Sequence, residues 1–489
     1  MEVKRGLHVA RRRGAGVAPG LFFAFLSMSG AGAVAQNPSS AVDPYFGSVT
    51  AQPVSDETLQ LSLDDAVRRG LENNLGLKEA ENEEKALHGE RDQALQQFLP
   101  TITLSGDTGY YEHNLAALGF SSSLLAQFAP LFPGGVLPPG FSIITKDYLT
   151  DGTLHFTETL FSGPVIAGWK AAGAAERSAY FAKMTARGQV VQNVADQYLR
   201  CIADASEVDE AQAQVTEAQT LYDHTHAEHQ AGTVAGIDEL RAQVELQAQQ
   251  QALIAAQNAV EKDEILLKRE IGVDPGQKIA LTDAAPYSEL ALETPAEVLA
   301  TAYKDRQDYQ NLQNQAVEYK AIHAAYRSQR WPSLKFEGYY QTSTVNGVGT
   351  HGNLLAMGTL SVPIFREAEL RGDEDASSAE MNAVNAQLDS LRQQIDEQVR
   401  SALLDVAAAA KLVDVARSNV ALATRALSDE TERVNAGVDN NLPLVTAQAT
   451  LATAQTNLVE SLYQYNVSKL GLARASGVLE QQYRVFLGR

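Results

Sequence analysis

The chain has 489 residues, with 39 Lys and Arg against 60 Asp and Glu, so its formal net charge is −21 at pH 7. An acidic chain lacks the basic surface that nucleic-acid binding requires, and this class of partner is excluded. The single cysteine excludes a framework of intramolecular disulfide bonds. Because Cys201 lies in the helical stretch "QYLRCIADA", we expect it to be a small buried side chain.

Residues 1–35 have the features of a secretory signal peptide. Basic residues between Lys4 and Arg13 precede the apolar stretch "APGLFFAFLSMSG", and "AVAQ" places small residues before a cleavage site after Ala35. This segment has five basic residues and one glutamate, a charge of +4, so the chain without it carries about −25. No later stretch has the ~18 consecutive apolar residues of a transmembrane helix, so none is expected.

After an N-terminal extension over 36–60, the first predicted element is a helix over residues 61–99. It is rich in Leu, Ala, Glu and Gln and ends before Pro100. "TITLSGDTGYY" and residues 154–161 then alternate with period two. They predict a β-hairpin over 101–161, with a long connecting loop over 114–148 that is rich in Pro, Gly and Ser.

The next predicted element is a long helical hairpin over 164–272. Residues 164–230 contain no proline after Pro164 and are rich in Ala, Gln and Glu, and residues 237–271 continue this composition after a turn. About 65 helical residues span roughly 100 Å, far more than an ordinary globular helix. The pattern is therefore typical of a coiled-coil-like rod, and a non-helical linker follows it.

The same order of elements then occurs again. A helix over 296–330 precedes Pro332, and residues 333–365 predict a second β-hairpin. A second long helical hairpin follows over 367–476, with its helices over 367–435 and 442–476. The first repeat thus spans 61–294, the second spans 295–478, and a tail covers 479–489.

Matching residues at fixed offsets support an internal duplication. Around the two helical turns, residues 205 positions apart are identical: Gly232 and Gly437, Ala242 and Ala447, Gln243 and Gln448, Leu246 and Leu451, Gly272 and Gly477. In the front halves the offset is about 232, as for Pro100 and Pro332. The longer first strand-to-strand loop accounts for the wider offset.

The four strands have the length of strands that cross a membrane at a tilt near 45°. One face of the second hairpin carries Leu334 and Phe336, and the other carries Lys335 and Glu337. Spanning strands must pair every backbone group in a closed barrel, and four strands cannot close one. Several copies must then share a barrel, and three copies would give twelve strands. The alternative is a soluble antiparallel sheet that packs on the helices.

The rods contain many small residues, as in "DVAAAAKLVDVARSNVALATRAL", and lack the sustained Leu and Ile seam of a two-helix zipper. Helices that contact neighbours on both sides of a cylinder would accommodate this composition. These residues favour an α+β membrane protein, in which several copies share a β-barrel that continues into a barrel of long helices, and a trimer would give a 12-stranded β-barrel.

The chain resembles the TolC-like outer-membrane efflux proteins. The residues that carry the resemblance are "LSLDDAVRRGLENNLGLKEAENE", "QFLPTITLSG", "QRWPSLKFEG", "VPIF", the two "AG" turns and the closing "YNVSKLGLARASGV". The resemblance implies a homotrimer, with its β-barrel in the outer membrane and an α-helical tunnel in the periplasm. It implies a passive exit duct of a tripartite efflux or type I secretion system, with a periplasmic adaptor and an inner-membrane transporter as partners and no cofactor. The alternative is a periplasmic coiled-coil scaffold with a soluble sheet.

The resemblance also implies that the two hairpin tips, residues 230–240 and 435–445, form the periplasmic gate and the docking site of the adaptor. The expected residues are Gly232, Ile237, Asp238, Glu239, Gly437, Asp439, Asn440, Leu442 and Pro443. Asp238 lies where the family often has an aspartate near the constriction. The second tip departs from the best-known members, because Asp439, Pro443 and Thr446 replace an arginine and two aspartates. A lock between Asp238 and an arginine is therefore in doubt, and the charges can equally be solvated turn residues.

A histidine cluster, "DHTHAEHQ", lies beside the first tip. His226 and His229 are neighbours on a helix and could share a metal or respond to pH near 6.5, but a solvated helix end explains them equally well. His224 belongs to the same cluster. No nucleophile elbow, phosphate-binding loop, HExxH or paired-cysteine motif is present, so the sequence does not support an enzyme or a metal site.

Overall fold

The computed structural model describes residues 43–49, 53–114, 122–135, 144–283, 287–345, 349–436 and 441–488. These residues belong to one unit, which begins at Asp43. The predicted signal peptide and its cleavage site after Ala35 lie outside the described residues, as do Gly437, Asp439 and Asn440 of the second tip.

Each repeat begins with two helices where one was predicted. Residues 61–99 contain α1 (Leu63–Asn73) and α2 (Leu75–Gln96), and residues 296–330 contain α6 (Pro295–Asp305) and α7 (Gln307–Ser328). The prediction of a single helix was therefore wrong in both repeats. Asn74 breaks the first one, because its side chain accepts from the N–H of Leu77 (3.1 Å) and donates to the carbonyl of Tyr45 (2.7 Å). An asparagine that caps a new helix in this way interrupts the preceding one.

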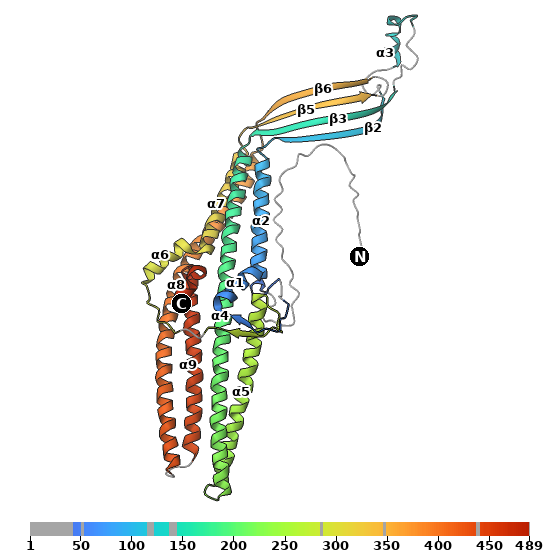
Figure 1. Ribbon diagram of the computed structural model, residues 1–489. Helices are drawn as coiled ribbons and strands as arrows, with labels where there is room; N and C mark the ends of the chain where they lie inside the picture. Colours follow the sequence, from blue (N-terminus) through green and yellow to red (C-terminus); the bar gives the residue numbers. More distant parts are fainter. Residues whose placement is uncertain are drawn as a thin grey trace, which may run out of the picture. The chain divides into compact units, whose positions relative to one another are not determined.

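The described residues form a four-stranded antiparallel sheet in the order β2–β3–β5–β6. Its strands are β2 (Thr101–Asn114), β3 (Ile144–Phe161), β5 (Ser333–Val345) and β6 (Gly349–Ser361). β3 begins ten residues before the predicted stretch 154–161, so part of the predicted loop 114–148 is strand. The short helix α3 (Ser122–Ala126) also lies in that connection. The two hairpins meet along β3 and β5, where Leu154 pairs with Tyr340 (Figure 1).

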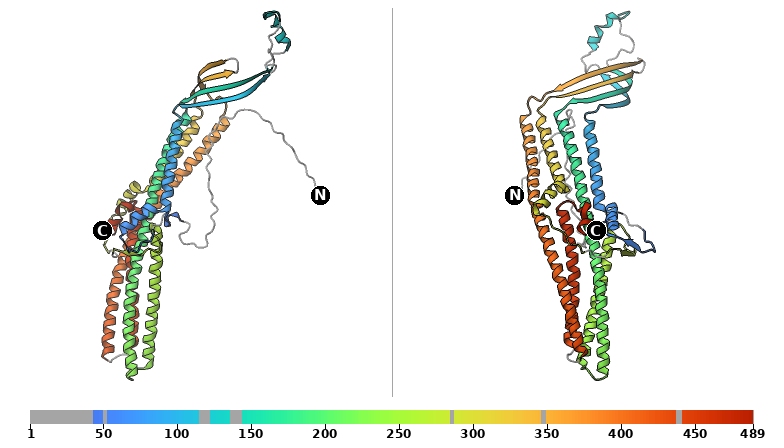
Figure 2. Two further views of the ribbon diagram at one scale, coloured as in Figure 1. Left: turned by 45° about the vertical axis from the view of Figure 1, so that its right-hand side comes forward. Right: turned by 60° about the vertical axis from the view of Figure 1, so that its left-hand side comes forward.

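The long helices are α4 (Gly163–Gln230), α5 (Gly236–Ile271), α8 (Glu367–Asn435) and α9 (Asn441–Ala475). Next to the sheet, the packing contacts give the order α2–α4–α7–α8. In the half farther from the sheet, the order is α5–α4–α9–α8. Figures 1 and 2 show the end of α4 and the start of α5, and likewise the end of α8 and the start of α9, on the side of the long helices that lies away from the sheet.

Two apolar cores form where the first two helices of each repeat meet the long helices, and the first core also includes residues of α9 and of α10 (Leu479–Phe486). The first core joins α1 to the middle of α4 and the end of α5, and Tyr198 at its centre donates to the carbonyl of Leu61 (3.0 Å). The second core joins α6 to α8 and α9 around Ile395. The end of the predicted N-terminal extension forms β1 (Leu59–Leu61), which pairs with β4 (Ile279–Leu281). The predicted tail forms α10. Cys201 is buried, as predicted.

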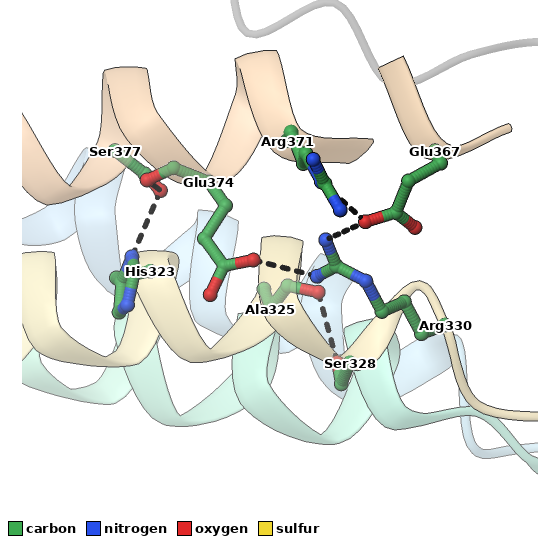
Figure 3. A network of polar contacts seen from close by, with 8 residues as sticks. All are labelled: His323, Ala325, Ser328, Arg330, Glu367, Arg371, Glu374 and Ser377. Carbon is green, nitrogen blue, oxygen red and sulfur yellow. Dashed lines mark hydrogen bonds and ion pairs between the residues drawn. The ribbon is translucent and has the colours of Figure 1, made fainter. Parts of the chain in front are cut away.

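A network of polar contacts joins α7 to α8 where both meet the sheet (Figure 3). Arg330, just after α7, donates to Glu374 (2.6 Å) and forms an ion pair with Glu367 (3.4 Å), both on α8. Glu367 also accepts from Arg371 (2.7 Å). A comparable arginine–glutamate pair joins α2 to α4 in the first repeat. These contacts fix the directions in which the chain enters and leaves the strands.

The two repeats end their second long helices in the same way. Gly272 follows α5 with φ +74°, and Gly477 follows α9 with φ +80°. In each case the next N–H, from Val273 or Val478, donates back to a carbonyl five residues earlier. Glycine adopts this left-handed conformation without steric cost. The left-handed backbone at the end of each helix thus explains why glycine occurs at both of these positions, which are 205 residues apart.

We expect Gly477→Ala to destabilise the protein more than Gly232→Ala. A Cβ at Gly477 would lie 2.7 Å from the backbone N of Arg306, in addition to the cost of about 1–2 kcal/mol for a left-handed alanine. Gly232 also has a positive φ, of 76°, but no atom lies within 4 Å of its added Cβ. Thermal unfolding of the purified protein in detergent, followed by circular dichroism, measures the difference. Equal melting temperatures for the two variants would contradict the packing argument.

Candidate functional site

The tip of the first helical hairpin turns through a left-handed glycine. α4 ends at Gln230, and Gly232 has φ +76°. The N–H of Gly232 donates to the carbonyl of His229, and the N–H of Thr233 donates to that of Glu228, both at 2.9 Å. These two bonds define the Schellman motif, which satisfies the last carbonyls of a helix. The tight turn expected at Gly232 is present.

The first turn of α5 carries the predicted tip residues Ile237, Asp238 and Glu239. The side chain of Ile237 is exposed (52 %). Asp238 forms an ion pair with Arg241, three residues later on the same helix (3.1 Å). The arginine partner of Asp238 within the chain is therefore local, and it does not come from the second hairpin.

Glu239 joins the end of α4 to the start of α5. Its carboxylate lies 2.6 Å from Nδ1 of His226 and also contacts Nδ1 of His229. The hydrogen bond from His226, followed by that from His229, holds the pKa of Glu239 below its usual range. His224 lies elsewhere, 3.5 Å from Glu228 on its own helix. The histidine cluster of the sequence thus divides into one pair that crosses the turn and one residue that does not.

The described part of the chain contains no group of three or more His, Cys, Asp or Glu side chains suited to holding a metal ion. Both imidazoles at the first tip are instead occupied by hydrogen bonds to one carboxylate.

The structure describes residues 435–436 and 441–445 of the second tip. Leu442 is about half exposed, Pro443 is partly exposed, and Leu444 is buried at 6 %. Thr446, which replaces an acidic residue of the best-known relatives, donates to the carbonyl of Leu442 (2.9 Å). Between Asn441 and Asn457, α9 has no charged side chain. The described part of the second tip is therefore apolar where the first is charged.

The two tips contact each other through a small apolar core. Leu221 of α4, Ala242 of α5 and Leu444 of α9 are its buried members. The partly buried side chains around them are Tyr222, Leu427, Val434 and Val445. The sequence interpretation selected Leu442 and Pro443 and missed Leu444. The available signal was that Leu444 stands at the position of Glu239, 205 residues earlier, which marks a change from a polar to an apolar environment.

One face of the sheet carries most of its large apolar side chains, and the other is mostly polar but includes Tyr339, Leu355 and Met357. The cross-strand register places the large apolar side chains in line with one another, and most are exposed, with Leu104 at 80 % and Leu354 at 78 %. Members of the apolar face are Ile102, Leu104, Tyr110, Tyr148, Leu154, Phe156, Phe336, Tyr340, Leu354 and Leu360. Members of the polar face are Thr103, Ser105, Thr153, His155, Lys335, Glu337, Gln341 and Asn353.

The outermost element on each side has a neighbour on one side only among the described residues. In the sheet these elements are β2 and β6, and in the half of the helices that includes the tips they are α5 and α8. Both helices expose large apolar side chains. These are Ile237, Leu240, Val244 and Ile254 on α5, and Leu404, Leu412, Val415 and Leu422 on α8.

None of the described helices combines the length and the apolar composition needed to cross a membrane.

A family comparison decides the class of protein. The family model of the outer membrane efflux proteins matches residues 66–273 and 301–478, which together cover most of the chain and both repeats. The chain belongs to the outer membrane efflux protein family. This result confirms the resemblance to the TolC-like proteins. The assignment of the chain to the outer membrane, to transport and to efflux follows from it.

Proteins of the outer membrane efflux family are passive channels and not enzymes. Family membership therefore supports an efflux-channel role over the alternative of a periplasmic coiled-coil scaffold with a soluble sheet. Comparison with curated protein sequences found no match.

Solved structures of three membrane proteins, two of which are outer membrane channels, have the same fold. A membrane protein from Pseudomonas aeruginosa superposes with a TM-score of 0.71 at 18 % identity, covering 85 % of this chain and 93 % of that one. The CmeC outer membrane channel of Campylobacter jejuni gives 0.70 at 15 %, covering 89 % and 92 %. The MtrE outer membrane channel of Neisseria gonorrhoeae, in its open state, gives 0.69 at 17 %, covering 88 % and 95 %.

We expect Leu444→Ala to loosen both hairpin tips of this efflux protein, because it removes a buried side chain from the core that joins them. Truncating a buried leucine costs about 2–5 kcal/mol. Leu442→Ala is the matched control, since Leu442 is 48 % exposed. Amide hydrogen exchange of peptides from residues 219–230 and 441–450 measures the effect. Faster exchange in both peptides is expected for Leu444→Ala alone, and an equal effect of the two substitutions would contradict the assigned core.

Proposed function

We propose that three copies of this chain assemble into one exit duct, a 12-stranded β-barrel in the outer membrane that continues into an α-helical barrel in the periplasm. The observation that carries the proposal is that the molecule has two open sides. On each of them the outermost strand and helices have a neighbour on one side only among the described residues. β2, α2 and α5 line one side, and β6 and α8 line the other, so each layer ends at the same two sides.

The sheet supports this assembly through its backbone. An edge strand leaves a row of N–H and C=O groups without partners, and in lipid each such group costs several kcal/mol. β2 has 14 residues and β6 has 13. Pairing β6 of one copy with β2 of the next satisfies these groups, and the alternating directions of the four strands make the new pair antiparallel. Three copies then close a ring of twelve strands.

The two faces of the sheet match the two sides of such a wall. A transmembrane barrel presents apolar side chains to lipid and polar side chains to its water-filled interior. The apolar face defined above would contact lipid, and the polar face, with Thr153, Lys335 and Glu337, would line the lumen. Tyr110 and Tyr148, whose rings are 5.3 Å apart, would lie in one interfacial aromatic belt.

The helices would close in the same way. The exposed apolar side chains of α5 and of α8 lie at opposite ends of the order α5–α4–α9–α8. Contact between α8 of one copy and α5 of the next would remove both surfaces from water. The resulting cylinder gives every long helix a neighbour on both sides, as the small residues of these helices favour.

The hairpin tips would form the periplasmic gate and the docking site of a periplasmic adaptor, which joins the duct to an inner-membrane transporter. The family supplies this general arrangement of trimer, adaptor and pump. The residues that we assign to it are Gly232, Ile237, Asp238, Glu239, Leu442 and Pro443, together with Gly437, Asp439 and Asn440 outside the described residues. The duct is passive, so the transporter would supply the energy.

A disulfide between neighbouring copies tests the trimer. Ser105→Cys on β2 is combined with Asn353→Cys, Leu355→Cys or Met357→Cys on β6, and all four positions face the same side of the sheet. Oxidation of the purified protein is expected to give covalent dimers and trimers for at least one of the three registers, because β2 and β6 of adjacent copies become neighbours. Denaturing electrophoresis without reductant measures the products.

The control is Thr153→Cys with Gln341→Cys, a registered pair within one chain, which should give no band above the monomer. Cys201 is buried and should not interfere. The absence of dimers and trimers in all three registers, or a ladder beyond three copies, would contradict the proposed ring.

A second disulfide tests the gate. Ala242 and Leu444 belong to the core that joins the tips, so Ala242→Cys with Leu444→Cys ties the first hairpin to the second. If the mouth opens by separation of the hairpins, oxidation should lower the single-channel conductance in a planar bilayer, and reduction should restore it.

Leu221→Cys with Ala242→Cys is the matched control, since it ties α4 to α5 inside one hairpin and leaves the hairpins free to separate. Equal conductance of the oxidised and reduced forms of the test pair would place the gate elsewhere.

A further inference from the structure

The two hairpin tips share an Ala-Gly pair in the sequence, but they differ at three positions that contact one another across the first turn. In the first tip these are His226, His229 and Glu239. The offset of 205 that aligns the two hairpins gives the equivalent residues as Thr431, Val434 and Leu444. In the second tip, Val434 and Leu444 belong to the apolar core. The duplication therefore supplies the molecule with one titratable tip and one tip that lacks titratable groups at these positions.

The contacts of the first tip define the protonation states that it accommodates. Both Nδ1 atoms face the carboxylate of Glu239, so each imidazole donates to it through Nδ1. On the other side of its ring, His226 places Nε2 2.7 Å from Nε2 of Gln230. The amide donates there, and Nε2 of neutral His226 accepts. A 180° turn of the Gln230 amide would present its oxygen to a protonated ring, so the site accepts a proton without moving its backbone.

The geometry points to a proton-operated clasp, in which protonation of His226 and His229 tightens their contacts with Glu239 and holds α4 to α5 at the first tip. A neutral imidazole already donates to the ionised carboxylate, and protonation of the ring adds the attraction between opposite charges across the same contact. The inference rests on the proposed function only where it links this clasp to the gate.

The surrounding charges leave Glu239 as the acceptor of both rings. On α5, Asp238 is paired with Arg241 (3.1 Å). On α4, Asp223 accepts from Gln219, and Glu228 faces His224 (3.5 Å). Of the two helices of the second hairpin that pack on this tip, α8 carries Glu430 and Arg433, which pair with each other (3.1 Å), and α9 has no charged side chain before Glu460.

The lower limit of the pH window follows from the sign of the Glu239 titration. The pKa of Glu239 is lowered by its histidine partners, so the stabilisation from its charge is present above the ordinary carboxyl range near pH 4.3 and is lost as pH falls through the lowered pKa. Imidazole groups in general gain their charge as pH falls through about 6.5. A carboxylate whose pKa is lowered remains charged in the pH range in which imidazole groups in general become protonated. The clasp is tightest there and weakens toward pH 8.

Amide hydrogen exchange of the assembled protein, in buffer that contains a metal chelator, tests the clasp. The measured quantity is the protection of residues 226–240 divided by that of residues 431–445, so that the second tip corrects for the intrinsic pH dependence of exchange. Between pH 8 and pH 5.5 we expect this ratio to rise roughly two- to fivefold, the range of partly exposed ion pairs.

Three variants separate the clasp from other causes. Glu239→Gln, and His226→Gln combined with His229→Gln, should abolish the rise. His224→Gln should keep it, because His224 contacts a carboxylate on its own helix and does not cross the turn. A constant ratio in the unaltered protein, or a rise that persists in Glu239→Gln, would overturn the proposal.

Conductance in a planar bilayer then separates the clasp from the gate. A lower conductance at pH 5.5 than at pH 8, lost in Glu239→Gln, supports a clasp that acts on the gate. A rise in the protection ratio with unchanged conductance supports the clasp and removes the first tip from the proposed gate.

Discussion

The two edge strands of the sheet, β2 and β6, constrain how copies of this molecule can associate in a membrane. Among the described residues, β2 and β6 each pair with one strand only, and a face with large apolar side chains lies between them. In lipid, such a sheet is stable only when its edges are closed by other strands. The helices have the same open arrangement. In the half that includes the tips, α5 and α8 are the outermost helices, and both expose large apolar side chains. One mode of association between copies would satisfy the sheet and the helices together.

The duplication explains why one chain can contribute both strands and long helices to a ring. Each repeat supplies a β-hairpin and a helical hairpin, and each ends its second long helix with a left-handed glycine. The backbone of the repeats is thus retained, while the side chains at the tips have diverged. Glu239 pairs with histidines, whereas Leu444, its equivalent, packs against Leu221 and Ala242. The two hairpins therefore have the same architecture and different chemistry at their tips.

The fold was predictable where it depends on local patterns. Proline and glycine punctuation, period-two alternation and long helical stretches indicate the order of elements, and motifs from both repeats carry the resemblance to the efflux family. The break at Asn74 was not predictable from these patterns, because it depends on a hydrogen bond to Tyr45, a residue 29 positions earlier. The sequence indicated which residues lie at the first tip, but it did not indicate which of them contact one another. The contact of Glu239 with His226 requires the path of the turn through Gly232, which brings together residues 13 positions apart.

Electron cryo-microscopy of the detergent-solubilised protein tests the central claim most directly, since it shows how many copies share the sheet edges. The account predicts a ring of three copies in which β6 of each chain pairs with β2 of the next, giving twelve continuous strands above a closed cylinder of helices. A monomer with free sheet edges, or a closed ring with a different number of copies, would contradict it.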